Sequence, residues 1–210
     1  MPPMTSADAQ AVLGAFQGHR LQGLVTVTLG LGLRLGEALG LKWPEVDLEH
    51  HQLRIVATLQ RLLDQDGIRQ WVLGRPKSKQ STRALPLPDA VADALQAERK
   101  GQVEAQLAAG SRWHETGFVF TGKTGEPWTQ KGRSMPSRAS SRWPASPTMR
   151  LHDLRHGCAT LLLAQKVPAR VVMEILGHSQ ISMTMDTYSR VVPALLGEAA
   201  AAMDSDLRPG

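Results

Sequence analysis

The period of the apolar residues changes twice along the chain, and this change limits the folds available to it. Helical spacing governs the two outer parts of the sequence, whereas the middle alternates as short strands do. The predicted helices cover residues 5–16, 21–33, 34–41, 88–109, 149 onward, 168–176 and 193 onward. The predicted strands cover residues 53–56, 68–73 and 83–87, with a hairpin turn at 64–67 and a short strand or core anchor at 118–120. The expected fold class is therefore mainly α with a small antiparallel β-sheet (α+β).

The composition is that of a folded, basic protein. The chain has 210 residues and a net charge of +5, which suits a polyanionic partner such as nucleic acid. No apolar run is long enough to cross a membrane, and the first residues lack the pattern of a secretory signal. A single cysteine, Cys158, excludes an internal disulfide and fits a reducing compartment. We therefore expect a cytoplasmic protein that does not act on membranes.

Glycines surround the first candidate cation. Gly30, Gly32 and Gly36 lie close to Arg34 and Glu37 in the sequence. The stretch lacks the third glycine of a G-x-G-x-x-G loop and no predicted strand precedes it, which excludes a Rossmann dinucleotide site. We expect these glycines to permit close helix packing that holds the arginine and the glutamate in place.

The predicted helix that begins near residue 149 separates apolar from polar side chains. Its apolar face comprises Leu151, Leu154, Cys158 and Leu161. His152, Arg155 and His156 are expected to project together from the opposite side, where they could bind an anion and transfer protons to or from it. The two histidines also mimic the H-E-x-x-H motif of zinc peptidases. Asp153 is shorter than the glutamate of that motif, and the nearby arginine would repel the metal, so this alternative is disfavoured.

Two further segments are basic. Lys77, Lys79 and Arg83 lie between two predicted strands, where such residues form either a solvated turn or a probe into a DNA groove. Residues 127–149 are rich in proline, serine and basic residues and contain no acid. A stretch of this length without predicted structure is unusual inside a compact domain. It is either a flexible surface loop or a basic strap along DNA phosphates.

Five short motifs, in a fixed order, resemble the tyrosine recombinase (phage integrase) family over nearly the whole chain. They are Gly-Leu-Arg34-Leu-Gly-Glu, Pro-Lys77-Ser-Lys-Gln-Ser-Thr-Arg-Ala-Leu-Pro-Leu, His152-Asp-Leu-Arg155-His, Leu-Gly-His178 and Met-Asp-Thr-Tyr188. Each motif is weak alone, but their order and spacing together are specific. The resemblance implies the catalytic-domain fold of that family.

The resemblance also implies a nucleophile and its electrostatic support. In this family a tyrosine hydroxyl attacks a DNA phosphodiester, leaving a 3′-phosphotyrosine link and a free 5′-hydroxyl. Tyr188, the only tyrosine in the chain, matches that position. Arg34 and Arg155 would hold the non-bridging oxygens, for which a planar guanidinium is better suited than an ammonium. The implied function is site-specific recombination or integration of double-stranded DNA, without a metal or other cofactor.

The remaining roles follow from the same resemblance. Lys77 would protonate the leaving 5′-oxygen as the general acid, with Lys79 as the alternative. His152 and His178 would position the phosphate and assist proton transfer. Lys79 and Arg83 are the expected DNA contacts. Family members also self-associate on DNA as a tetrameric synapse, and we expect the alanine-rich run at 193–206 to dock on a neighbouring copy.

The sequence departs from the family pattern in several places. We expect residues 1–210 to form the catalytic domain alone, without the N-terminal domain that completes the DNA clamp in relatives. The 127–149 segment replaces an amphipathic helix, and Arg190 stands where a histidine is common. These departures leave two alternatives open: a catalytically weak or inactive DNA-binding remnant, and a related topoisomerase that nicks single strands without synapsis.

Overall fold

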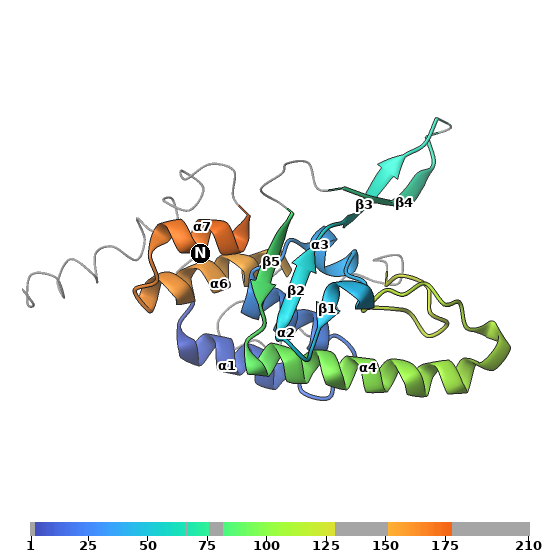
Figure 1. Cartoon of the computed structure of the whole chain (residues 1–210), viewed down its shortest axis with the longest axis horizontal. Helices are drawn as coiled ribbons and strands as arrows, with labels where there is room; N and C mark the ends of the chain where they lie inside the picture. Colours follow the sequence, from blue (N-terminus) through green and yellow to red (C-terminus); the bar gives the residue numbers. More distant parts are fainter. Residues whose placement is uncertain (1–2, 66, 76–81, 129–150, 178–210) are drawn as a thin grey trace, which may run out of the picture.

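The computed structural model describes residues 3–65, 67–75, 82–128 and 151–177 (Figure 1). The helices are α1 (Ser6–Ala15), α2 (Gln22–Leu31), α3 (Leu35–Leu39), α4 (Asp89–Ala109), α6 (Leu151–Ala164) and α7 (Ala169–Leu176), with 3₁₀ turns at η1 (Trp43–Glu45) and η3 (Gly110–Arg112). The strands are β1 (Val46–Asp47), β2 (Gln52–Ile55), β3 (Thr58–Leu63), β4 (Arg69–Gly74) and β5 (Arg83–Pro86). Helices dominate over short antiparallel strands, which confirms the predicted fold class. Within these residues, no helix is long and apolar enough to cross a membrane.

The strands form two small sheets, and the prediction of a single sheet is wrong. One sheet has the order β1-β2-β5, while β3 and β4 pair with each other in a hairpin that projects from the body in Figure 1. The predicted turn at 64–67 joins β3 to β4, and Asp64 accepts a hydrogen bond from the Ile68 amide at 2.7 Å. The sequence does not predict β3, because burial along it follows no alternation: only Thr58 and Leu59 are buried.

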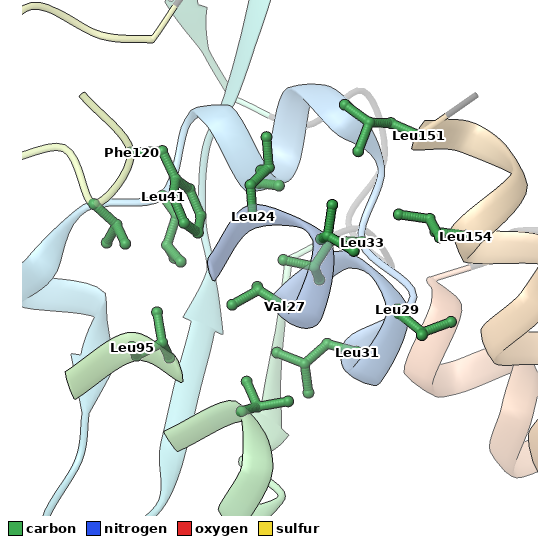
Figure 2. Close-up of a cluster of buried hydrophobic side chains, with 14 of the residues drawn as sticks. Leu24, Val27, Leu29, Leu31, Leu33, Leu41, Leu95, Phe120, Leu151 and Leu154 are labelled. Carbon is green, nitrogen blue, oxygen red and sulfur yellow. The ribbon is translucent and has the colours of Figure 1, made fainter. Parts of the chain in front are cut away.

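Helix α2 lies at the centre of the hydrophobic core. It packs against α4 and also against α6, and seven of its ten residues are buried, as expected for a helix enclosed by neighbours. Figure 2 shows Leu154 of α6 directed toward Leu33, which follows the end of α2. Leu151, Leu154 and Cys158 are buried, and Leu161 packs against the same core. The predicted apolar face of this helix is therefore confirmed.

Glycines allow the segment around Arg34 to pack closely against its neighbours. A Cβ atom on Gly36 would lie 2.8 Å from the backbone oxygen of Leu59, and one on Gly30 would lie 2.5 Å from a Val91 methyl carbon. Gly32 ends α2 in the left-handed conformation, with φ of +61°. The expectation that these glycines permit close packing is confirmed.

Substitution of Gly32 by alanine is expected to lower the free energy of unfolding by about 2–4 kcal/mol. The alanine would be strained at positive φ, and its Cβ would lie 2.3 Å from a Leu176 methyl carbon and 3.2 Å from the Cys158 sulfur. Urea denaturation measures the loss. The control is Gly101→Ala in α4, where an added Cβ meets nothing within 4 Å and should stabilise the helix by about 1 kcal/mol. Equal effects of the two variants would contradict this account of Gly32.

Candidate functional site: an arginine cluster at the end of α7

Three arginine side chains converge on the C-terminal end of α7. They come from three elements: one precedes α3, one begins β5 and one lies within α6. Each donates to one of three consecutive carbonyl oxygens. The pairs are Arg83 Nε with Ile175 at 2.7 Å, Arg155 Nη2 with Leu176 at 2.8 Å and Arg34 Nη2 with Gly177 at 2.9 Å. The last carbonyls of a helix lack intrahelical partners and carry its negative dipole end, so cations are stabilised there.

A buried carboxylate joins two of these arginines. The side chain of Glu37 is 2% exposed, and its Oε1 accepts from Arg34 Nη1 at 2.8 Å. Arg83 donates to both carboxylate oxygens, at 3.3 and 3.1 Å. Burial acts strongly to raise the pKa of Glu37, but the hydrogen bonds and charge of Arg83, together with the bonds from Arg34, bring this pKa below its ordinary value of 4.5. Glu37 is therefore ionised at neutral pH.

Arg155 is a buried cation between the C-terminal ends of two helices. The residue is 3% exposed, and its Nη1 donates to the carbonyl of Gly32, the C-cap of α2, at 2.6 Å. Burial, followed by repulsion from Arg34 and partly offset by Glu37, lowers the pKa of Arg155 to about 9. The guanidinium is still protonated at pH 7. Its two hydrogen bonds to carbonyls use two of its five N–H groups.

The cluster carries more positive than negative charge. The charged groups that act on Arg155 are Arg34, Arg83 and Glu37, so one carboxylate faces three guanidiniums among the described residues. A buried surplus of cations is unfavourable unless an anion completes the site. Arginine pairs suit a phosphate, because two parallel N–H groups match two of its oxygens. The arrangement therefore has the chemistry of a phosphate site.

The two histidines of α6 lie together, but apart from the arginine of the same helix. His152 and His156 are exposed, and their rings meet edge to face with centroids 4.9 Å apart. Arg155 points inward, so the prediction that all three project together is wrong. Its helical position places it on the boundary of the apolar face, and the carbonyls of α2 and α7 draw the guanidinium inside. No group of three or more metal-binding side chains exists within the described ranges.

Several predicted site residues lie outside the described residues. These are Lys77, Lys79, His178 and Tyr188, together with Arg190, the run at 193–206 and most of the segment at 127–149. Of the others, the structure brings Arg34, Arg155 and Arg83 to one place.

Arg83 has contacts that the sequence did not indicate. Its side chain is 8% exposed and binds Glu37 and the Ile175 carbonyl, whereas contact with DNA stays a prediction. The sequence does signal the glutamate, because Glu37 lies three residues after Arg34 and can cap the start of α3. No local pattern signals the backbone carbonyls of α7 as partners of the arginines.

Apart from the arginine cluster, a cavity of about 480 Å³ lies between the start of α2, α4 and residues 121–123. Glu98 lines it, and burial raises the pKa of this carboxyl to about 7, against the opposing charge of Arg20. Because folding favours the protonated acid, its contribution to stability is complete below pH 4.5 and is lost as the pH rises through about 7.

Glu98→Gln is therefore expected to make the protein more stable than wild type by about 1–2 kcal/mol at pH 8, with no difference near pH 4. Urea denaturation at both pH values measures this. Glu104→Gln, on the exposed side of the same helix, should change stability by less than about 0.5 kcal/mol at either pH. A Glu98→Gln protein that is less stable at pH 8 would contradict the assignment.

Comparison with known proteins identifies the family of the chain. The model of the phage integrase family matches residues 4–194. A tyrosine recombinase XerC-like protein of Caldanaerobacter subterraneus is 36% identical over 193 residues, which are 89% of this chain and 49% of that protein. The chain spans about half the length of the curated relatives it matches.

Solved structures show the same fold. The integrase of transposon Tn1549 in complex with transposon right-end DNA superposes with a TM-score of 0.75 at 23% identity, over 94% of this chain and 66% of that one. A lambda integrase tetramer bound to a Holliday junction gives a TM-score of 0.54 at 17% identity, over 89% of this chain and 47% of that one. Since the family model covers nearly all of the sequence and the fold agrees, the chain belongs to the phage integrase family.

Proposed function

We propose that the chain cleaves and rejoins double-stranded DNA at specific sites through a 3′-phosphotyrosine intermediate. The observation that carries this proposal is the arginine cluster, in which, among the residues that the structure describes, three guanidiniums face one carboxylate at the end of α7. Its surplus positive charge suits the phosphate of DNA, and its position in a phage integrase fold supports the reaction of that family.

In this reaction the Tyr188 hydroxyl oxygen attacks the phosphorus, and the bond from phosphorus to the 5′-oxygen breaks. Lys77, or alternatively Lys79, gives its proton to the departing oxygen, while the tyrosine proton is lost as attack proceeds. His152 and His178 position the phosphate and assist that proton transfer. The link between tyrosine and DNA retains the phosphodiester, so attack by a 5′-hydroxyl reverses the steps without an external energy source.

The arginines act on the transition state. Negative charge grows on the non-bridging oxygens during attack, and Arg34 and Arg155 stabilise it by donating their remaining N–H groups. The side chain of Arg34 is 37% exposed and is therefore open to a ligand. Arg155 is buried and forms the inner side of the proposed phosphate site. Because both are already held by helix carbonyls, little reorganisation is needed when the charge develops.

The partners follow from the same proposal. Lys79 contacts the DNA backbone, and copies of the chain assemble on DNA in a tetramer. The lambda integrase tetramer on a Holliday junction supports this assembly by its similar fold. The reaction takes place in the cytoplasm, in keeping with the single, buried Cys158.

The test uses nicked DNA duplexes with a randomised central sequence, because the target is to be found as well as the activity. The nick lies close to the cleavage site, so the short fragment that bears the new 5′-hydroxyl diffuses away after attack. The covalent product therefore accumulates. Wild-type protein is expected to yield protein-linked DNA that survives denaturing electrophoresis and carries a shared sequence. Tyr188→Phe should yield none. Absence of adduct with wild type, or an adduct of equal yield with Tyr188→Phe, would refute the proposal.

A further inference from the structure

We propose that Arg83 is a positioning residue that fixes the two chain segments bearing the proton-transfer groups relative to the phosphate site. One of these segments carries Lys77 and ends just before β5, and the other begins with His178 directly after α7. The roles of that lysine and that histidine rest on the proposed function, whereas the contacts of Arg83 do not.

Arg83 belongs to one of the elements that adjoin these segments and contacts the other. It is the first residue of β5, where it pairs with Ile55 of β2, so its backbone belongs to the three-stranded sheet. Its Nε reaches the Ile175 carbonyl near the end of α7, two residues before the chain leaves that helix. A single side chain therefore ties the sheet to the helix where the chain enters β5 and where it leaves α7.

This tie lies beside a space that the side chains of the described residues leave open. A cavity of about 460 Å³ lies between β5 and α7 and is lined by residues of both, including Arg83, Ile175 and Gly177. Packing alone therefore does not hold these two elements together along their length. The hydrogen bond of Arg83 supplies a fixed distance where close packing is missing.

The opposite end of the guanidinium is itself fixed. Arg83 donates to both oxygens of Glu37 at 3.3 and 3.1 Å, and the same carboxylate binds Arg34. The side chain thus links the sheet, α3 and α7 through three hydrogen bonds. Only a planar guanidinium can donate to a carboxylate in two places and to a carbonyl in a third direction, so lysine cannot replace it.

The first test needs no DNA. Arg83→Met and Arg83→Lys are compared with wild type by hydrogen exchange of the α7 amides over residues 172–177. We expect exchange there to quicken at least about tenfold in both variants, because the helix end loses the one contact of the three that ties it to the sheet. Arg54→Met serves as the control, since Arg54 lies on the neighbouring strand, is itself exposed and pairs with Glu45. Its exchange in α7 should match wild type.

The second test measures DNA attachment on a nicked duplex selected with the wild-type protein. The rate at saturating DNA is expected to fall about 100-fold in Arg83→Met and in Arg83→Lys, while the dissociation constant for DNA stays within about twofold. A displaced catalytic group slows the reaction without weakening the binding of substrate. The dependence of binding on salt should also be unchanged, because no phosphate contact is lost.

Two outcomes would overturn the proposal. If Arg83→Lys attaches to DNA at the wild-type rate and Arg83→Met binds DNA more weakly with a lower salt dependence, Arg83 is a direct DNA contact. If exchange in α7 is the same in all proteins, Arg83 does not fix the helix end. Failure of wild type itself to attach to DNA would refute the proposed function instead, and the exchange measurement would still decide the role of Arg83.

Discussion

Replacement of Arg155 by methionine is expected to slow covalent attachment to DNA by about 10²–10³-fold, with a change of less than about 2 kcal/mol in the free energy of unfolding. The loss of rate follows from the removal of a fixed cation from the developing charge on the phosphate. The small effect on stability follows from two opposing changes: the hydrogen bonds of the guanidinium are lost, but its buried charge is removed as well. Most buried arginine replacements would instead lower rate and stability together, so the separation of the two effects is the informative result.

The two changes can be compared from the surroundings of Arg155. Burial and the neighbouring guanidiniums disfavour the charged form inside the protein, and they lower the pKa of Arg155 to about 9. Against this, the side chain donates charged hydrogen bonds to the Gly32 and Leu176 carbonyls, each worth about 1.5–3 kcal/mol. Methionine loses the bonds but also removes the buried charge, and it retains most of the apolar volume.

Single-turnover attachment at saturating DNA and urea denaturation measure these two effects. Arg112→Met is the control, because this exposed arginine at the far end of α4 removes one positive charge without touching the cluster. Its rate at saturating DNA should equal that of wild type. A methionine variant of Arg155 that reacts normally would contradict its role at the phosphate, and one that unfolds would show that the guanidinium is mainly structural.

Replacement of Glu37 by glutamine is expected to lower the free energy of unfolding by about 3–5 kcal/mol at pH 7. Glutamine has nearly the same shape but no charge, so Arg34 and Arg83 lose the buried carboxylate that, among the described residues, offsets them both. The repulsion among the three guanidiniums then acts without compensation. The burial of Glu37 makes this interaction much stronger than a surface ion pair.

The pH dependence gives a second signature of Glu37. Because its pKa is lowered in the folded protein, the stabilisation is complete above the ordinary value of 4.5 and is lost as the pH falls through the folded value. The difference between wild type and Glu37→Gln should therefore shrink below pH 4.5. Glu174→Gln, which removes an exposed pair with Arg170, should change stability by less than about 0.5 kcal/mol. A Glu37→Gln protein within 1 kcal/mol of wild type at pH 7 would contradict the buried network.

The sequence predicted those features that depend on local spacing. The apolar face of α6, the turn at 64–67 and the glycines around Arg34 all follow from residues a few positions apart. The sequence did not predict β3. Its burial is determined by the contact with α3, which brings Leu59 against Gly36. A tertiary contact, and no alternating pattern, determines that strand.

The candidate site was predicted in its residues but not in its geometry. The resemblance identified Arg34 and Arg155, yet nothing near them in the sequence shows that helix carbonyls hold both guanidiniums. The inward direction of Arg83 depends on Glu37, 46 residues earlier, and on Ile175, 92 residues later. Such long-range pairs leave no periodic trace, so the sequence indicates a basic turn there without indicating its internal contacts, and contact of Arg83 with DNA stays a prediction.

The identity of the residue that becomes joined to DNA decides whether Tyr188 is the nucleophile. After attachment to a nicked duplex, digestion with nuclease and trypsin leaves a nucleotide on one peptide, which mass spectrometry can locate. We expect the nucleotide to lie on Tyr188, within the tryptic peptide 171–190, and the link to resist alkali as an aryl phosphate ester does. A nucleotide on any other residue, or a link that alkali cleaves as it cleaves a serine ester, would contradict this expectation.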